Sequence, residues 1–507
     1  MSGVKVWLTV AALTLCSFLV MLDMSIIATA IPQITTSFRA LMDVGWYGSS
    51  YLLASSAVQP LTGKLYLAFE VKSTFLAFLT LFELGSLLCG AASSSTSFII
   101  GRAVSGLGAS GLLNGALTII AAAVPMHQRP ALIGVVMLVG QIGMVGGPVL
   151  GGVLTQYASW RWCFYINLPV GAIAVICLAA IQIPDRFGRL RAKKSTMLSR
   201  LLNLDPVGFC LFASWTVMFL MALQWGGTFY PWRSAMIVGL FCGAAGTAII
   251  FATWEKSVGD NAMFPYSMLR KRVVWSSCVV IFLFQGCALI YSYYVPTYFQ
   301  AVKGVSPLAS GVYNSPGIGS QMVFAGVSSV LVGKLGHYLP WSVASAIIVA
   351  VGSGLMSTLT PHSGAARWIG YQLLAGIGRG CGATMPMVAV QNILEPEQIP
   401  LGMSLVAFCQ SFGGSIFLTL AQTIFNGSLL SGLRRFAPTV DAQAVIDAGA
   451  SGIREAVKPE EVAGVLQAYN LGISREFFLA GGASIGVLAF SWGMGWHSVR
   501  RQKAEGR

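Results

Sequence analysis

Residues 140–152 read GQIGMVGGPVLGG, which places six glycines and one proline within thirteen residues. They lie inside the run 131–154, which has no charged residue. A run of that length and composition predicts a helix that crosses a membrane, although glycine and proline are the poorest helix formers in water. Because helical residues advance about 100° each, Gly143, Gly147 and Gly151 are expected on one narrow face of this helix.

This glycine face is typical of close packing between two membrane helices. The three glycines form two overlapping G-x-x-x-G patterns, which let a neighbouring helix approach closely. Pro148 removes one backbone hydrogen bond and is expected to bend the helix. A bilayer helix tolerates this because nearby groups satisfy the freed carbonyl. On the pattern alone, a generic packing surface is favoured over a specific transport role.

The composition excludes an ordinary soluble protein. Of the 507 residues, 55% are hydrophobic and 9% are charged, whereas soluble proteins carry roughly 25% charged residues. The net charge of +14 does not indicate nucleic acid as a partner, because the basic residues fall between apolar runs, as cytoplasmic anchors do. The ten cysteines include no C-x-x-C pair, and the four histidines lie in or beside loops. No metal site is therefore expected.

Fourteen apolar runs, each of about 18 to 27 residues, predict membrane spans. The first run continues too far for a signal peptide and lacks a convincing cleavage site, so it is expected to be a retained span. The runs lie near residues 6–31, 45–69, 73–93, 97–124, 131–155, 163–183, 206–225, 234–254, 273–299, 309–333, 341–360, 367–393, 402–424 and 477–497.

The distribution of basic residues predicts that both termini are cytoplasmic. With that orientation, the inner segments hold 19 Lys and Arg residues, whereas the short outer loops hold five. An excess of basic residues in short loops marks the cytoplasmic side. The sequon Asn426-Gly427-Ser428 then lies on the outer side, where Asn426 is expected to be glycosylated.

These spans predict an all-α polytopic membrane protein with fourteen transmembrane helices, arranged as two six-helix bundles plus two extra central helices. The long outer segment carries apolar residues at mixed helical spacing. This favours one or two short amphipathic helices on the outer surface, or a partly ordered loop. The expected segments are an N-terminal bundle over 1–183, a basic cytoplasmic loop over 184–205, two extra spans over 206–254, a C-terminal bundle over 273–497 with an outer loop over 425–476, and a cytoplasmic tail over 498–507.

Four stretches resemble the motifs of one transporter family. In chain order they are MLDMSIIATAIP (21–32), GRAVSGLGASG (101–111), the glycine-rich stretch 140–152 and WRWCFYINLPVG (160–171). Together they resemble the fourteen-span drug:proton antiporter branch of the major facilitator superfamily. With LFELGSLLCGAA, they are similar to fungal members that export toxins and secondary metabolites.

The resemblance implies roles for individual residues. Asp23 matches the first-span aspartate motif, and Arg102 matches the fourth-span arginine motif, which implies a part in proton transfer. The inner loop after the second span departs from the pattern, because Leu67 stands where an acid is expected and Glu70 only partly replaces it. The conformational latch attributed to this loop is therefore in doubt. The residues that match the antiporter motif are Gly143, Gly147, Pro148 and Gly151.

Asp23 and Glu83 are the two acids expected well inside spans. A charge at the centre of a membrane helix costs roughly 2.5–3.5 kcal/mol on insertion scales, so such residues are functional by default. Burial also favours the protonated form of a carboxyl group, which suits proton binding and release. Asp23 is expected to couple or gate transport, with a structural hydrogen bond as the alternative. Glu83 is expected either to carry protons or to pair with a cation between spans.

Arg102 and Arg379 are the two cations expected within spans. Arg379 lies in GIGRGCG, where the flanking glycines leave room around the guanidinium. An ion pair between spans is slightly favoured for Arg379 over a contact with substrate.

Polar and aromatic residues within other spans are candidates for a substrate cavity. The stretch YNSPGIGSQ (313–321) predicts an interrupted helix that lines a cavity. Tyr291 and Tyr294 share a helical face with Tyr298 and could stack on an aromatic ligand, although their position near the outer end favours an aromatic belt. The other cavity candidates are Asn114, Gln141, Asn314, Gln321, Arg379 and Gln410.

The leading interpretation is a secondary transporter that exports a hydrophobic small molecule, such as a toxin, drug or secondary metabolite. Proton antiport with alternating access would drive it, because no G-x-x-x-x-G-K-[ST] motif for ATP is visible. No cofactor is expected. The alternative is proton-coupled uptake or vacuolar transport of a siderophore or basic amino acid, since the direction of transport is not written in the sequence.

Other classes of protein are not favoured. An enzyme would need a nucleophile–base or metal constellation within the spans, and a channel would need a ring of pore-lining groups. Neither pattern is visible. The resemblance implies a monomer that works within the lipid bilayer on protons and a small molecule. The plasma membrane is the expected location, with the vacuolar membrane as the alternative.

Overall fold

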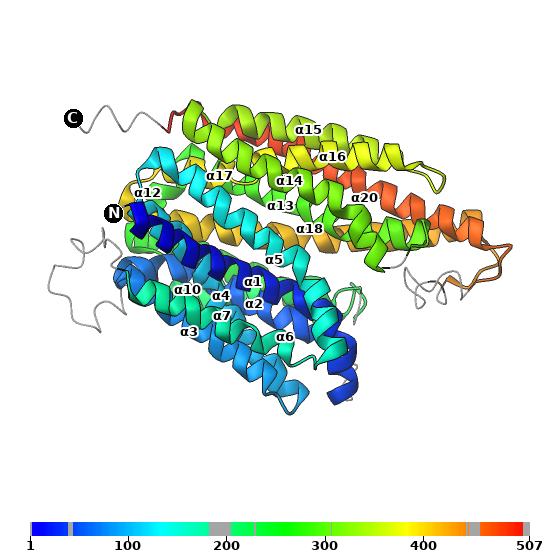
Figure 1. Cartoon of the computed structure of the whole chain (residues 1–507), viewed down its shortest axis with the longest axis horizontal. Helices are drawn as coiled ribbons and strands as arrows, with labels where there is room; N and C mark the ends of the chain where they lie inside the picture. Colours follow the sequence, from blue (N-terminus) through cyan, green and yellow to red (C-terminus); the bar gives the residue numbers. More distant parts are fainter. Residues whose placement is uncertain are drawn as a thin grey trace. The chain divides into compact units, whose positions relative to one another are not determined.

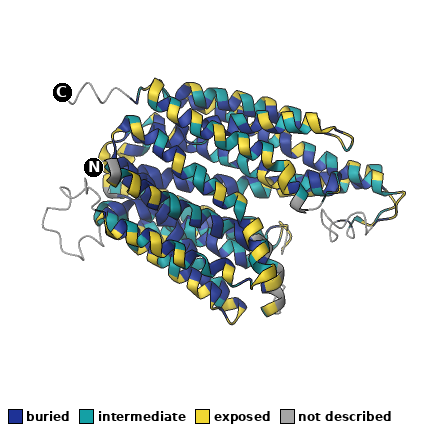
Figure 2. Cartoon of the chain, in the orientation of Figure 1, coloured by how far each residue is buried: buried dark blue, intermediate teal, exposed yellow. Residues whose placement is uncertain are grey.

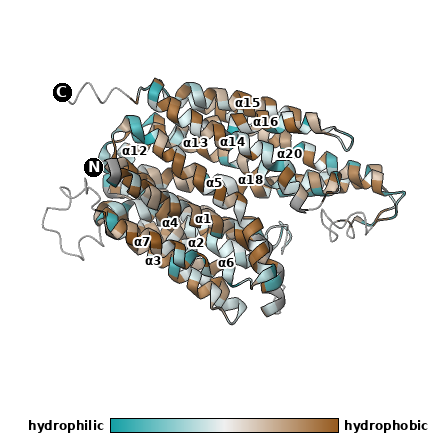
Figure 3. Cartoon of the chain, viewed as in Figure 1, coloured by the Kyte–Doolittle hydropathy of each residue, from teal (hydrophilic) through white to brown (hydrophobic). Residues whose placement is uncertain are grey.

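Long apolar helices make up most of the described chain. The computed structural model describes residues 3–38, 44–181, 204–227, 230–305, 307–442, 445 and 457–499. Thirteen helical segments in these ranges are long and apolar enough to cross a membrane, and the same ranges contain no β-strand. Figure 3 shows apolar residues distributed along the full length of most helices. The prediction of an all-α polytopic membrane protein is confirmed.

The chain, whose helices Figure 1 labels, forms two units. Each unit has its own cluster of buried hydrophobic residues. Unit 1 comprises Met1–Val274, Met387–Phe408 and Val499–Arg507, and unit 2 comprises Trp275–Pro386 and Cys409–Ser498.

Unit 1 contains the helices that carry the four quoted motifs. It also contains α10 and α11, the two helices that follow the basic inner segment. Its longer helices are α1 (Gly3–Phe38), α2 (Val44–Ala68), α3 (Val71–Gly90), α4 (Ser95–Ala123), α5 (Arg129–Tyr157), α10 (Pro206–Trp225) and α11 (Ala235–Val258). Its shorter elements are η2 (Met126–Gln128), α6 (Trp162–Tyr165), α7 (Asn167–Ala179), η3 (Gly259–Asn261), α12 (Tyr266–Leu269) and η5 (Pro396–Gln398).

Unit 2 is built from the later helices of the chain. Two helices, α13 and α18, begin in unit 1 and run on into unit 2, and α17 starts at the end of a unit 2 segment. The elements are α13 (Arg272–Thr297), η4 (Tyr298–Val302), α14 (Pro307–Leu335), α15 (Leu339–Ser357), α16 (Ala365–Gly382), α17 (Met385–Ile393), α18 (Ile399–Phe436), α20 (Val462–Ser491) and η6 (Trp492–Met494).

Helix α2 occupies the second predicted span but is not among the thirteen apolar segments. Its 25 residues are enough to cross a bilayer. Small polar side chains lower its hydropathy, and three of them, Ser56, Gln59 and Thr62, are buried. They face other helices rather than lipid, so the helix tolerates them.

Burial separates central helices from peripheral ones within unit 1. In the most apolar window of each helix, 83% of the α4 residues are buried, against 11% of the α11 residues. Figure 2 shows the exposed residues along the outward faces of the helices. Because α4 packs against both α2 and α3, its polar side chains are enclosed by protein, whereas α11 presents an apolar surface suited to lipid.

Two basic residues of unit 1 cap the C-terminal ends of neighbouring helices. Lys72 Nζ donates to the carbonyl oxygens of Ala179 and Ile181, each at 2.8 Å, where α7 ends. Arg129 Nη2 donates to the carbonyl of Ala121 at 2.8 Å, where α4 ends. A cation at a helix C-terminus satisfies free carbonyls and complements the helix dipole.

Two predictions about helix boundaries are wrong. Helix α14 runs without interruption through Pro316, because the loss of one backbone hydrogen bond is tolerated inside a membrane helix. The outer loop predicted over 425–476 is shorter, since α18 continues to Phe436 and α20 already begins at Val462. The amphipathic helices predicted there fall partly on residues 443–444 and 446–456, which lie outside the described residues.

Candidate functional site

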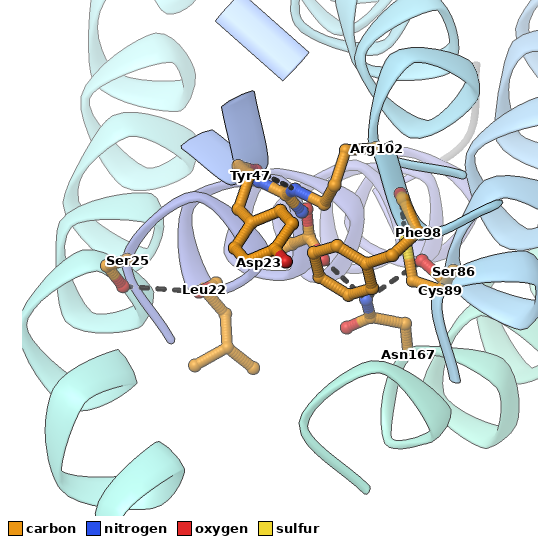
Figure 4. Close-up of polar contacts among 9 residues, drawn as sticks. All are labelled: Leu22, Asp23, Ser25, Tyr47, Ser86, Cys89, Phe98, Arg102 and Asn167. Carbon is orange, nitrogen blue, oxygen red and sulfur yellow. Dashed lines mark hydrogen bonds and ion pairs between the residues drawn. The ribbon is translucent and has the colours of Figure 1, made fainter. Parts of the chain in front are cut away.

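A buried ion pair joins the first and fourth predicted spans. Arg102 Nη1 of α4 donates to Asp23 Oδ2 of α1 at 2.6 Å, and the two side chains are 1% and 0% exposed. Figure 4 shows the two side chains pointing toward each other between the helices. The prediction that Asp23 and Arg102 lie within spans is confirmed, and the structure brings them into direct contact.

Neutral polar groups complete the surroundings of this pair. Asn167 Nδ2, at the start of α7, donates to Asp23 Oδ1 at 3.2 Å and to Ser86 Oγ of α3 at 3.0 Å. Arg102 Nε donates to the backbone carbonyl of Tyr47 at 3.0 Å. The guanidinium also lies over the ring of Tyr51, with 4.6 Å from Cζ to the ring centroid. Five helices therefore meet at one carboxylate and one guanidinium.

The contact between α1 and α4 at this pair depends on the opposite charges of Asp23 and Arg102. Both oxygens of Asp23 accept a hydrogen bond, and a buried pair of this kind is held by charge as well as by geometry. A proton on Asp23 would remove the charge that attracts Arg102. Arg102 would keep its contacts to Tyr47 and Tyr51, which are neutral. The attraction between α1 and α4 would therefore weaken, while the guanidinium of Arg102 kept its neutral partners on α2.

Glu83 of α3 lies one turn of helix before Ser86. Both of its carboxylate oxygens are buried, and within the described ranges neither has a hydrogen-bond partner. A Cβ at Gly171 of α7 would overlap the Glu83 carboxyl group, so α7 approaches it closely. The alternative that Glu83 pairs with a cation between spans is wrong for the described chain. The acid also lies within electrostatic range of Asp23.

The glycine face of α5 packs on α1, as its spacing predicts. A Cβ at Gly143 would lie 2.5 Å from the carbonyl oxygen of Phe18, and a Cβ at Gly147 would overlap Ser25 Oγ. Gly151 is also buried, and Pro148 lies inside the helix at an exposed position. A Cβ at the neighbouring Gly146 or Gly152 would meet nothing within 4 Å. The close-contact interpretation of the spacing is confirmed.

The cavity candidates of unit 1 do not gather at one place. Asn114 of α4 is fully buried and donates from Nδ2 to Thr62 Oγ1 of α2 at 2.8 Å. Its side-chain oxygen has no partner among the described residues. Gln141 is half-buried on α5. Asn114 therefore ties α2 to α4 and offers one free acceptor.

In unit 2 the structure brings Tyr291 and Arg379 together. Arg379 of α16 is 7% exposed, and its Cζ lies 4.4 Å from the centroid of the Tyr291 ring. Arg379 Nε donates to the carbonyl of Ala375 at 3.4 Å. Among the described residues no acid pairs with Arg379, so the predicted ion pair is wrong. A Cβ at Gly317 of α14 would lie 3.5 Å from Arg379 Nη2.

Tyr291 and Tyr294 of α13 and Tyr298 of η4 do not form an aromatic belt. Tyr291, Tyr294 and Tyr298 are 2%, 5% and 1% exposed, whereas a belt needs rings at the lipid headgroups. The Tyr291 hydroxyl bonds to Ser353 Oγ at 2.9 Å, and Tyr294 packs its ring against Phe425. The belt interpretation is wrong, and the rings are part of the interior of unit 2.

The remaining cavity candidates of unit 2 lie on two other helices. Gln410 Nε2 of α18 donates to Gln285 Oε1 of α13 at 3.1 Å. Asn314 and Gln321 are half-buried on α14, one on each side of Pro316. The structure joins none of these three residues to the pair of Tyr291 and Arg379. Each stays a separate candidate for the substrate cavity.

Two surface predictions can be placed. Glu70 is exposed before α3 and accepts a hydrogen bond from Ser73 at 2.6 Å, and it forms no ion pair in the described chain. It therefore does not replace the acid missing at Leu67 with an equivalent salt bridge.

Asn426 is exposed, but it lies within α18 rather than in a loop. Its glycosylation stays a prediction.

Two functional candidates escaped the sequence analysis. Asn167 lies inside the quoted motif 160–171, and an amide within a span was the available signal. Glu476 lies in α20, fully buried. The sequence places it at the end of the outer loop predicted over 425–476, a segment with charged residues up to Arg475.

Comparisons with known proteins agree over nearly the whole chain. A model of the Major Facilitator Superfamily matches residues 13–418. The efflux pump mlcE of Penicillium citrinum is 53% identical over 505 residues, which cover 98% of this chain and 91% of that protein. The MFS-type transporter pigP of Monascus ruber is 50% identical over 499 residues, which cover 98% and 87%.

Solved structures share the fold at low sequence identity. The proton:xylose symporter XylE bound to 6-bromo-6-deoxy-D-glucose is 14% identical, with a TM-score of 0.63. The match covers 97% of this chain and 96% of that chain.

Proposed function

Since the chain belongs to the Major Facilitator Superfamily, we propose that it exports a hydrophobic small molecule in exchange for protons. It is an integral membrane transporter and not an enzyme. The proposed substrate class is a toxin, drug or secondary metabolite. In the proposed cycle the proton gradient is the energy source, and access to the substrate site alternates between the two sides of the membrane.

The buried pair of Asp23 and Arg102 carries the proposal. A carboxylate inside a membrane is retained for function by default, and this one is fully buried and bonded on both oxygens. Asp23 is the proposed proton carrier. In its charged form it holds Arg102, and in its protonated form it releases that hold. Proton binding would therefore favour one packing of α1 against α4, and proton release the other.

The glycine contact between α5 and α1 fits the same cycle. Helix α1 carries Asp23 on one side and meets Gly143 and Gly147 of α5 on another. Smooth glycine surfaces let helix backbones lie in close contact without interlocking side chains. A shift of α1 that follows protonation would therefore meet little steric resistance from α5.

The proposed architecture has fourteen spans, with α2 added to the thirteen apolar segments. They would form two six-helix bundles and the extra pair of α10 and α11. The transporter is proposed to act as a monomer in the plasma membrane. Glu83 is proposed to assist Asp23 in carrying protons.

The names of the relatives favour export over uptake. Three proteins at 40% to 53% identity are named efflux pumps, from Penicillium citrinum, Monascus pilosus and Arthroderma benhamiae. No feature of the described residues favours a siderophore or a basic amino acid. The guanidinium of Arg379, which has no acid partner among the described residues, would repel a basic substrate that approached it.

Loss of the chain is expected to trap its substrate inside the host cell. Untargeted mass spectrometry would compare small molecules inside and outside cells with and without the gene. The proposal predicts a compound that accumulates inside on loss and returns to the medium when the wild-type chain is restored. A compound that stays outside on loss would instead establish uptake and overturn the proposed direction.

A further inference from the structure

Glu476 is an acid in the interior of unit 2 that the proposed cycle does not use. It lies at the middle of α20 and is 0% exposed. Neither carboxylate oxygen has a hydrogen-bond partner in the part of the chain that the structure describes. The adjacent Arg475 points elsewhere, since it is exposed and donates to Ser428 Oγ at 3.0 Å.

The surroundings of Glu476 are apolar and aromatic. It belongs to a helix face whose residues Tyr469, Ile473 and Phe477 lie in one buried hydrophobic cluster. The same cluster includes Tyr294 of α13 and Phe425 of α18, and Tyr294 lies within electrostatic range of Glu476.

No cation pairs with Glu476 in the described part of the chain. The buried ionisable side chains of this cluster are Cys287, Tyr291 and Tyr294 of α13, Tyr298 of η4 and Tyr469 of α20. All five are neutral in their ordinary forms. Helix α15 contributes no ionisable side chain. On α18, Phe425 and Ser428 point toward α20. The guanidinium of Arg379 is stacked on Tyr291.

A charged carboxylate at this position would have no counter-ion and no hydrogen-bond donor among the described residues. An ionised group that leaves water without a partner pays a large desolvation penalty, and in practice such a group becomes neutral instead. A structural role would be visible as hydrogen bonds, which Asp23 has and Glu476 lacks. A glutamate at this position therefore lowers the stability of the fold, and its presence is explained by function.

We propose that Glu476 is a second proton-binding site, located in unit 2 and separate from Asp23. The step is a proton transfer. The carboxylate takes a proton from a hydronium ion, which becomes water, and the neutral acid is then buried as in this structure. In another state of the transporter, Glu476 meets water and returns the proton. The proposal rests on proton antiport as the proposed function, and it adds a second carrier to the cycle.

The test is infrared difference spectroscopy of the purified full chain, recorded between mildly acidic and alkaline buffers. The carbonyl band of a protonated carboxyl group in apolar surroundings is the signal. Wild type is compared with Glu476→Gln, which keeps the shape of the neutral acid, and with Glu460→Gln, which removes an exposed acid. We expect Glu476→Gln to remove one titrating band that Glu460→Gln leaves in place. An identical set of titrating bands in wild type and Glu476→Gln would overturn the proposal.

A second measurement covers the case in which Glu476→Gln fails to fold. Dicyclohexylcarbodiimide reacts with protonated carboxyl groups in apolar surroundings, and peptide mass spectrometry locates the adduct. In the wild-type chain we expect an adduct at Glu476 whose yield falls severalfold as the pH rises. No adduct, or a yield independent of pH, would contradict an exchanging proton.

Failure of this inference differs from failure of the proposed function. A titrating Glu476 in a transporter that ignores the proton gradient would refute antiport and leave the site standing. A silent Glu476 in a transporter driven by the gradient would leave Asp23 as the carrier and refute the second site.

Discussion

Replacing Asp23 by Asn is expected to abolish proton-driven transport and to destabilise the fold. The amide cannot take up and release a proton, and its single oxygen can accept only one of the two hydrogen bonds that Arg102 and Asn167 donate to Asp23. It also leaves the buried guanidinium of Arg102 without a counter-ion. Removal of one partner from a buried ion pair lowers the free energy of unfolding by about 3–5 kcal/mol. Transport in vesicles and thermal unfolding in detergent measure the two effects separately.

A double variant separates coupling from stability. In Asp23→Asn/Arg102→Gln both charges are removed, so no uncompensated charge is left buried. We expect the double variant to recover most of the lost thermal stability and none of the proton-driven transport. If Asp23→Asn alone transports with the wild-type dependence on pH, the carrier role of Asp23 is refuted.

Replacing Gly147 by Leu is expected to prevent unit 1 from folding, or to leave only a small fraction of the protein folded. Even a Cβ at this position would overlap Ser25 Oγ and lie 2.9 Å from the backbone nitrogen of Ile26. The backbone of α1 would have to move away from α5. Overpacking of an interior typically costs about 1–3 kcal/mol and occasionally more, and a backbone clash belongs at the upper end.

The matched control for this variant is its neighbour in the sequence. Gly146 lies in the same helix with nothing within 4 Å of a Cβ built on it, so Gly146→Leu adds the same side chain at an open position. The yield of monodisperse protein on size-exclusion chromatography compares the two. We expect a severalfold lower yield for Gly147→Leu than for Gly146→Leu. Equal yields would show that the contact between α1 and α5 does not require glycine.

The elements that the sequence predicted well are those whose physics is local. Helical periodicity alone places Gly143 and Gly147 on one face, and the lack of side chains there requires a close neighbour. Asp23 and Arg102 stand out because charges are rare within apolar runs. The helix α2 was also predicted from its length, although its polar residues lower its hydropathy.

The elements that the sequence did not predict depend on contacts across the chain. Asn167 meets Asp23 across 144 positions, and no spacing rule connects them. Tyr291 and Tyr294 lie near a span end, as belt residues do, but residues of α15, α16, α18 and α20 enclose them in one buried cluster. The sequence places Glu476 at the end of the outer loop predicted over 425–476, whose charged residues continue up to Arg475. In the helix, however, consecutive residues point about 100° apart, so one is exposed and the other buried.

Reconstituted vesicles with an imposed pH gradient test the central claim most directly. The full chain would be incorporated, and movement of the compound identified by the metabolite comparison would be followed with the gradient in each direction and after its collapse. Our account predicts movement opposite to the proton gradient, reversal when the gradient is reversed, and loss of accumulation in Asp23→Asn. Accumulation of the compound that persists unchanged after collapse of the gradient would contradict proton antiport.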